Sequence, residues 1–368
     1  MTQVNAQLQV PLLMKIHLFL SLILSTAWVS AQTHKHTGAR PDGHAPIMVM
    51  ADHSHGKGDF MASYRFMFMD MDGMRSGTNG VDPSDVFSSN YTVSPTDMTM
   101  KMHMLGMMYA PTDTITLMGM TSLQEKEMSH TIFPMAAPLI ALNDGSREFT
   151  TRSSGLGDLK LSALIQTLKG EDDRAHITLG LSLPTGSISK KDKIPGPGGR
   201  IDRQLPAPMQ LGSGTTDLLA GFTYTKQEET RSWGTQLNSV IRLDENSHDY
   251  RLGNRVEALG WLAWRIIPSA SVSMSAYAIT EGKLHGTQKN VGQAPPFAPT
   301  RRTVTTAFGE NYGGEQAGIR LGLNFLGEEA GSNGHRIAAE IDIPIYRDLN
   351  GFQLETDYTF TLGWQKAF

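Results

Sequence analysis

Apolar and polar residues alternate strictly in several stretches of this chain, and this pattern limits its fold more than any other feature. The clearest stretch is 174–183, whose apolar members are Ala175, Ile177, Leu179, Leu181 and Leu183. Residues 316–325 and 336–345 repeat the arrangement. Successive side chains of a strand point to opposite sides, so each stretch predicts a strand with one apolar and one polar face. After the N-terminal region, no apolar run reaches the roughly 18 residues that a membrane-crossing helix needs.

Segments of this kind number about twelve, and the connectors between them alternate in length. The predicted strands lie near 58–71, 96–109, 113–124, 156–169, 174–183, 215–227, 231–243, 250–266, 269–282, 314–327, 334–346 and 352–368. The long connectors cover about 72–95, 125–155, 184–214 and 283–313. An even strand number, with short turns at one end and long loops at the other, is typical of bacterial outer-membrane barrels. We therefore expect an all-β protein, a transmembrane antiparallel up-and-down β-barrel of about 12 strands over residues 58–368.

The N-terminus reads as an export signal. Lys15 is followed by an apolar stretch over 16–28 and by the small-residue site Val29-Ser30-Ala31. This order predicts a cleaved signal peptide over residues 1–31, with translation starting at Met14. A mature chain from Gln32 would then reach the outer membrane of a Gram-negative bacterium, and residues 32–57 would form a His-rich periplasmic tail.

Charge and cysteine content exclude several classes of protein. The net charge is −4, so the chain has no excess of Lys and Arg to neutralise the phosphates of a nucleic acid. It contains no cysteine, which excludes disulfides, thiolate catalysis and Cys-based metal sites. For a barrel in the outer membrane, the expected partners are lipid and lipopolysaccharide, and nucleic acid is not expected.

The last predicted strand carries an aromatic pattern that ends at the C-terminal residue. Its apolar face comprises Tyr358, Phe360, Leu362, Trp364 and Phe368. A terminal strand of this kind is expected to be the signal that the barrel-assembly machinery binds.

Charged residues fall on the predicted inner face of several strands. They are Arg65, Lys160, Arg251, Arg255, Glu257, Arg265, Arg320, Arg336, Glu340 and Asp342. In a barrel such residues line the lumen, where they tune selectivity or brace the interior.

Three Gly-containing motifs resemble a known family. They are Gly155-Leu156-Gly157-Asp158-Leu159-Lys160-Leu161, Leu179-Gly180-Leu181-Ser182-Leu183-Pro184-Thr185-Gly186 and Gly212-Ser213-Gly214-Thr215-Thr216-Asp217. From about residue 58 to its end, the chain resembles the outer-membrane transporter family associated with the meta-cleavage pathway of phenol degradation. The resemblance implies a channel-like barrel. The Met-rich N-terminal part of this chain is a departure, because an association with phenol degradation does not explain it.

Methionine and histidine are concentrated near the start of the mature chain. Of 21 Met residues, 17 lie between Met48 and Met135, and five of 12 His residues lie between His34 and His55. Thioethers suit Cu(I) and imidazoles suit copper and zinc, so the candidate metal ligands are His34, His36, His44, His53, His55, Met61, Met67, Met69, Met118 and Met120. On the second strand, Lys101 and His103 should face the lumen, which would turn Met98, Met100, Met102 and Met104 toward lipid. Flexible apolar packing is the alternative interpretation of the whole cluster.

The predicted function is an outer-membrane, porin-like channel or transporter for small solutes, with copper handling as a candidate role and copper as the candidate cofactor. Two alternatives stay open. One is a periplasm-facing metal-binding barrel without transport, and the other is a barrel hydrolase. Ser129-His130 and the luminal pair His176 and Ser182 lack a nucleophile motif, so we predict that the protein is not an enzyme.

Overall fold

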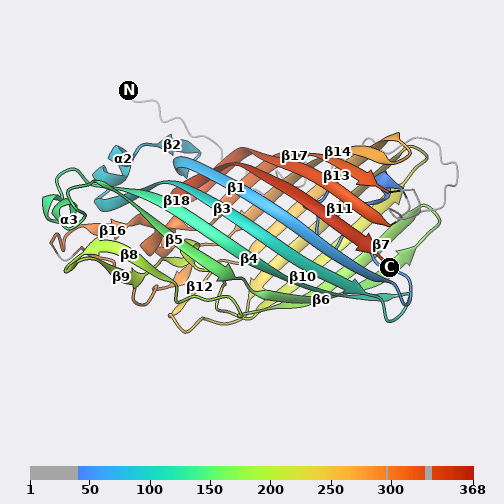
Figure 1. Cartoon of the computed structure of the whole chain (residues 1–368), viewed down its shortest axis with the longest axis horizontal. Coiled ribbons are helices and arrows are strands. Elements are labelled where there is room, and N and C mark those ends of the chain that lie inside the picture. The colour runs from blue at the N-terminus through green and yellow to red at the C-terminus, as the bar shows by residue number, and fades with distance from the viewer. Residues whose placement is uncertain (1–39, 296, 328–333) are drawn as a thin grey trace, which may run out of the picture.

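The computed structural model describes residues 40–295, 297–327 and 334–368 and shows a closed β-barrel (Figure 1). The predicted signal peptide and residues His34 and His36 lie outside the described residues. The wall is built from β1 (Phe60–Gly77), β3 (Tyr91–Tyr109), β4 (Ile115–Ile132), β5 (Glu148–Leu156), β6 (Leu159–Lys169), β7 (Asp173–Leu183), β10 (Asp217–Gln227), β11 (Arg231–Arg242), β13 (Arg255–Ile267), β14 (Ala270–Glu281), β17 (Gly314–Leu326) and β18 (His335–Ala367).

Antiparallel pairing joins neighbouring wall strands into a ring. β1 pairs with β3 on one side, where Phe60 lies opposite Tyr109, and with β18 on the other, where Met61 lies opposite Ala367. β4 pairs with β6 through its first part and with β5 through its second part, so β5 and β6 share one position in the wall. Because the first and last strands pair, the wall leaves no open edge of the kind that a membrane would have to cover.

β18 is a hairpin whose two halves belong to different positions in the wall. Its first half pairs with β17 and its second half with β1. The halves contact each other where Ala367 N donates to Gly334 O (3.3 Å) and Trp364 Nε1 donates to His335 Nδ1 (3.0 Å). Gly351 makes the reversal with a φ of +57°, in the left-handed region that favours glycine. With β18 counted twice and β5 and β6 counted together, the described residues form about twelve wall segments, so the predicted fold class is confirmed.

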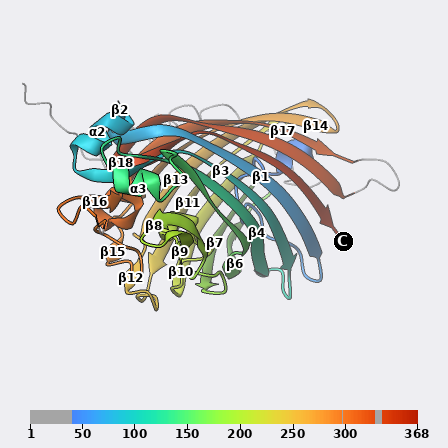
Figure 2. The same ribbon diagram turned by 60° about the vertical axis from the view of Figure 1, so that its left-hand side comes forward.

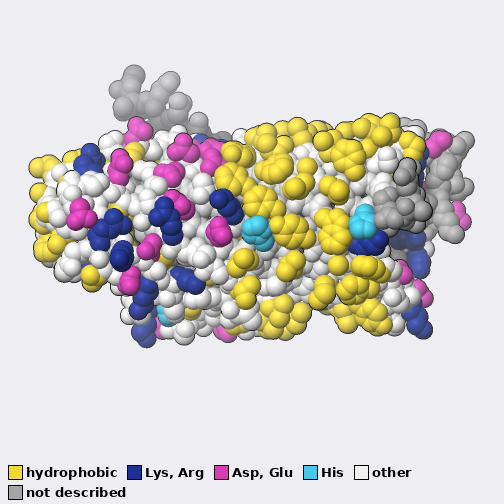
Figure 3. Space-filling view, viewed as in Figure 1, with side chains coloured by type: hydrophobic (Ala, Val, Ile, Leu, Met, Phe, Trp, Pro, Cys, Tyr) yellow, Lys and Arg dark blue, Asp and Glu magenta, His cyan; other side chains and the backbone are white. Residues whose placement is uncertain are grey.

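An apolar belt covers the outside of the barrel over the part nearer its short turns, and Figure 3 shows it on one face. It consists of outward side chains such as Leu105, Leu117, Leu179, Leu237 and Leu321, which are 46–60% exposed to the surrounding medium. Such a belt matches the apolar band that outer-membrane barrels present to lipid. In the described residues, no helix is long and apolar enough to cross a membrane.

The long connectors gather at the other end of the barrel, the long-loop end, and carry short elements of their own (Figure 2). These elements are β2 (Asn79–Val81), α2 (Pro83–Ser88), α3 (Ala137–Ala141), β8 (Lys191–Gly196), β9 (Gly199–Gln204), η2 (Ala207–Met209), β12 (Tyr250–Arg251), β15 (His285–Gly286), β16 (Arg302–Val304), η3 (Thr305–Ala307) and η4 (Gly309–Asn311). The predicted loop 125–155 is wrong in part, because β4 continues to Ile132 and β5 pairs alongside it. Beyond the apolar belt, a strand no longer needs an apolar outer face, so the pattern that marks it in sequence fades.

Candidate functional site: a plugged lumen

Residues 40–59, which we call the plug segment, fold into the barrel at its short-turn end. The segment begins with η1 (Pro41–Gly43), and side chains of the wall hydrogen-bond to its backbone. Ser271 Oγ donates to Pro41 O (2.9 Å), Arg65 Nε donates to Ile47 O (3.0 Å), and His176 Nε2 donates to Ala51 O (2.8 Å). Residues 40–57, which were predicted to belong to a periplasmic tail, therefore pack against the inner face of the wall. Buried backbone needs hydrogen-bond partners, and the polar inner face of the wall provides them.

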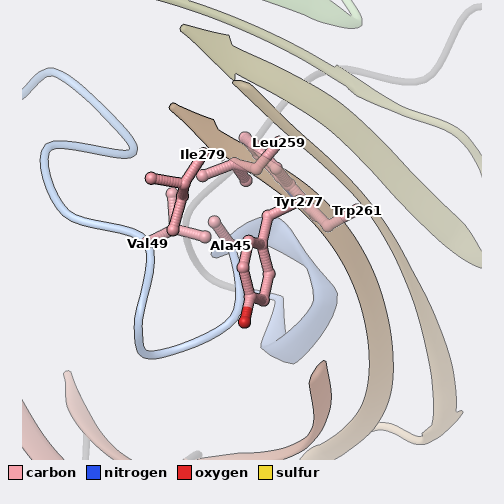
Figure 4. Close-up of a cluster of buried hydrophobic side chains, with 6 residues drawn as sticks. All are labelled: Ala45, Val49, Leu259, Trp261, Tyr277 and Ile279. Atoms are coloured by element: carbon pink, nitrogen blue, oxygen red, sulfur yellow. The ribbon is translucent and has the colours of Figure 1, made fainter. Parts of the chain in front are cut away.

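An apolar cluster fixes the middle of the plug segment (Figure 4). Ala45 and Val49 pack against Leu259, Trp261, Tyr277 and Ile279 of β13 and β14, and all six are at most 8% exposed. Ile47, 1% exposed, lies beside Gly363, where a Cβ would come within 2.5 Å of its side chain. The plug segment thus combines polar anchoring with close apolar packing.

Ion pairs occupy the wall beside the plug segment. Arg320 bonds Asp342 and Glu257, each at 3.0 Å, and its guanidinium lies 4.2 Å above the ring of Tyr277. Glu340 accepts a hydrogen bond from the backbone of Met48 (2.7 Å). We call this region over β13, β14, β17 and β18 the charged wall.

The structure places most of the predicted lumen-lining charges inside. Arg65, Arg320, Arg336, Glu340 and Asp342 are buried in the lumen. Four others also take inward positions. Lys160 lies on the same strand face as the buried Ser162 and Leu164. Arg255 and Glu257 form an ion pair, and Arg265 donates a hydrogen bond to Glu229 O at a short turn. Arg251 is the exception.

Arg251 belongs to β12, which pairs with β15 among the long loops rather than with the wall. The predicted strand 250–266 is interrupted after Arg251 and resumes at Arg255. In the gap Gly253 packs directly on Gly282, where a Cβ would lie 1.9 Å from the carbonyl oxygen.

Methionine side chains cover the lumen-facing side of β1, β3 and β4, which we call the methionine wall. Cross-strand partners in an antiparallel sheet share a face, and Met67 lies opposite Met102, Met69 opposite Met100, and Met108 opposite Met118. Thirteen of the 21 Met residues take these inward positions: Met61, Met67, Met69, Met71, Met74, Met98, Met100, Met102, Met104, Met108, Met118, Met120 and Met128.

The predicted orientation of the second strand is therefore wrong. Met98 and Met104 are buried, whereas Leu105 and Met107 are about 60% exposed on the opposite face. His103 shares that outer face, where its Nδ1 lies 2.8 Å from the hydroxyl of Tyr64. The alternation of Leu105, Met107 and Tyr109 was the sequence signal that should have outweighed the two polar residues.

Residues 205–211 pack against the inner face of β3 and β4 at the long-loop end. Leu205 and Met209 pack against the inward Met98 and Met128. Lys126 Nζ donates to Pro208 O (2.9 Å) and to Gln210 O (2.5 Å). Chain segments therefore enter the lumen from both ends.

Four of the predicted metal ligands, His44, His53, His55 and Met61, line one cavity beside the plug segment, together with Asp52, which the sequence analysis did not select. Ligand atoms of His44, Asp52 and His53 all lie within 4.8 Å of one another. The rings of His55 and His53 meet edge to face with their centroids 4.7 Å apart, and Met61 lines the same cavity of about 280 Å³. Met118 packs against Met61, whereas Met67, Met69 and Met120 take inward positions on the methionine wall.

Burial and local charge set the ionisation of this group of residues, which precedes the spanning strands. Burial, together with the nearby His53, lowers the pKa of His55 to about 4. Burial alone would raise the pKa of Asp52, but His53 and His44 hold it well below its usual range. At neutral pH a neutral imidazole therefore lies near an ionised carboxylate.

The candidate hydrolase residues have other roles in the structure. His176 Nε2 is engaged with Ala51 O, and Ser182 lies six positions along the same strand. His130 is buried and stacks on Phe149, with ring centroids 4.7 Å apart.

Comparison with solved structures supports the architecture. An outer-membrane channel from Pseudomonas putida F1 is 14% identical, with a TM-score of 0.56, covering 87% of this chain and 99% of that one. Two further structures are more distant. The β domain of the Bordetella autotransporter BrkA is 9% identical, with a TM-score of 0.44, and the match covers 85% of this chain and 100% of that one. A Pseudomonas aeruginosa FadL homologue is 9% identical, with a TM-score of 0.39, and the match covers 91% of this chain and 98% of that one. No family model and no curated protein matches the chain.

The closed ring, the apolar belt and the likeness to the Pseudomonas putida structure define the class. The protein is a β-barrel of the outer-membrane type with a plugged lumen. At 14% identity, the likeness extends to the fold.

Proposed function

We propose that this protein is an outer-membrane channel for small solutes in a Gram-negative bacterium, here in a closed state. The observation that carries the proposal is how the lumen is filled. An eight-stranded barrel is about narrow enough for wall side chains to fill it, and a twelve-segment barrel is wider. In this barrel the plug segment and residues 205–211 occupy the ends, and both are connectors rather than parts of the wall.

The methionine wall supports a preference among solutes. Thioethers are apolar, flexible and polarizable, so a surface of them adapts to small uncharged molecules of varied shape. The charged wall lies against the plug segment, where Arg320 is neutralised by Glu257 and Asp342. A path along the methionine wall would therefore avoid these ion pairs.

Planar-bilayer recordings of the mature chain test this function. Deleting residues 40–57 should raise the conductance, and replacing residues 205–211 with a Gly-Ser linker in the same chain should raise it further. Resistance of the unheated barrel to SDS provides the folding control. A folded variant carrying both changes that stays silent would contradict a channel.

A metal-binding barrel without transport is the second candidate function. The convergence of His44, Asp52 and His53 favours it. It predicts stoichiometric metal in the wild type and silence in every plug variant, so the same recordings separate the two functions.

A further inference from the structure

The plug segment contains a loop whose two ends meet at a set of metal-ligand side chains. His44 follows η1, and Asp52 and His53 come eight and nine residues later. Between them the chain makes its apolar contacts through Val49 and returns. The two ends already touch, because Ala45 N donates to Asp52 Oδ2 (3.1 Å).

The ligand atoms are held in place by the barrel rather than by the loop alone. Arg336 Nη2 donates to Ala45 O (2.5 Å), which fixes the backbone next to His44. His176 donates to Ala51 O, which fixes the backbone next to Asp52. Asp52 Oδ1 lies 2.9 Å from His53 Nδ1, an arrangement in which a carboxylate orients an imidazole. Preorganised ligands of this kind lose little conformational freedom when an ion binds.

A second, independent observation lies in the same cavity. The Nε2 atom of His55 is buried and has no hydrogen-bond partner. Buried ring nitrogens are normally hydrogen-bonded, so this atom marks a position where a further ligand or a metal-bound water fits. The cavity of about 280 Å³ provides room for one.

We propose that His44, Asp52 and His53 bind one divalent transition-metal ion, which fastens the two ends of the plug loop together. Two imidazoles and one carboxylate suit Zn(II) and Cu(II), and Cu(II) ranks above Zn(II) at such sites. With three protein ligands, the coordination sphere has an open position facing the cavity. The ion would hold the plug segment in its closed conformation, and this role requires only the plug, not conduction through the barrel.

Metal titration of the full mature chain tests the site. The chelator-stripped barrel is titrated with CuSO₄ and, separately, with ZnSO₄ in a calorimeter. We expect one ion per chain, and the affinity should fall about 100-fold or more in His44→Ala and in His53→Ala. Each variant removes a direct ligand, and even the loss of a group that only orients a ligand costs about 10–100-fold. His285→Ala is the matched control, since His285 is exposed in β15 among the long loops.

Cu(II) electron paramagnetic resonance supplies a readout that a folding defect would not imitate. The wild type should show coupling to two imidazole nitrogens, and each single variant should show one fewer in a barrel that still resists SDS. Unchanged affinity and coupling in both variants would overturn the proposal. So would a loss of binding in the double variant His34→Ala/His36→Ala with retention in His53→Ala, because the ion would then bind outside the plug segment.

Discussion

Placing a carboxyl group in the apolar cluster of the plug segment, through Val49→Asp, should release the plug. Val49 is 1% exposed and packs with Ala45 against β13 and β14. Losing the buried valine costs roughly 1.5–2 kcal/mol. A carboxyl group in that environment either stays charged at a larger cost or takes up a proton, which costs roughly 2–4 kcal/mol through a pKa raised by a few units.

The sum, roughly 3.5–6 kcal/mol, shifts the equilibrium toward the displaced plug by about 300-fold or more. Displacing the plug removes the penalty because the introduced carboxylate would then be hydrated, so the barrel itself should keep its stability. In planar bilayers the open probability should rise steeply, while the SDS resistance of the unheated protein stays that of the wild type.

Lys57→Asp is the control for introducing an acidic residue. Lys57 belongs to the same segment, and its side chain is exposed. Its open probability should match the wild type. If Val49→Asp conducts no more than Lys57→Asp while deletion of residues 40–57 opens the channel, the apolar cluster does not hold the plug and the reasoning is refuted.

Three further perturbations test other parts of the structure. Ile341 lies on the lipid-facing side of β18, and Ile341→Arg should lower the unfolding free energy by about 2–4 kcal/mol if the site is near the bilayer midplane. Denaturant titration in vesicles measures this change, and a neutral effect would mean that the site does not face lipid. Deleting Phe368, which is 68% exposed and whose ring lies 5.8 Å from that of Phe60, should sharply reduce outer-membrane accumulation in fractionated cells; normal accumulation would count against a terminal assembly signal. In plug-deleted barrels, Met102→Leu should leave liposome influx of an uncharged solute unchanged and Met102→Asp should reduce it, whereas equal rates in all three would place the path elsewhere.

The wall could be predicted from sequence because its pattern reports a physical boundary. A strand inside the apolar belt meets lipid on one side and polar lumen on the other, so alternation locates it, as at 174–183. Lys101 shows where the rule stops working. It lies opposite Glu125 on β4, near the exposed pair of Glu127 and Arg152, in a region of outward charges beyond the belt. An outward charge is solvated there, so it says nothing about the lumen.

The plug segment was beyond the reach of the same reasoning. Its contacts come from strands far apart in the chain, such as Arg65 on β1, His176 on β7 and Ser271 on β14, and they bond to its backbone rather than to particular side chains. Every residue has a backbone carbonyl, so contacts of this kind do not depend on which residues the plug segment contains and cannot be read from its sequence. The histidines of residues 32–57 were recognised as candidate ligands, but their meeting with Asp52 depends on that inward folding.

The plug is held at two separate places, and this arrangement determines what metal binding would do to gating. Val49 lies in the apolar cluster, whereas His53 lies at the return of the loop. If the plug segment leaves as one body, an ion at His44, Asp52 and His53 should oppose the opening caused by Val49→Asp, and chelation should restore it. If only the middle of the loop moves, Arg336 and His176 keep the ends of the loop fixed whether or not an ion is bound. The ion should then leave the open probability of Val49→Asp unchanged. The open probability of Val49→Asp and of Val49→Asp/His53→Ala, each with and without ZnSO₄, therefore separates a unit that is withdrawn from a loop that flexes in place.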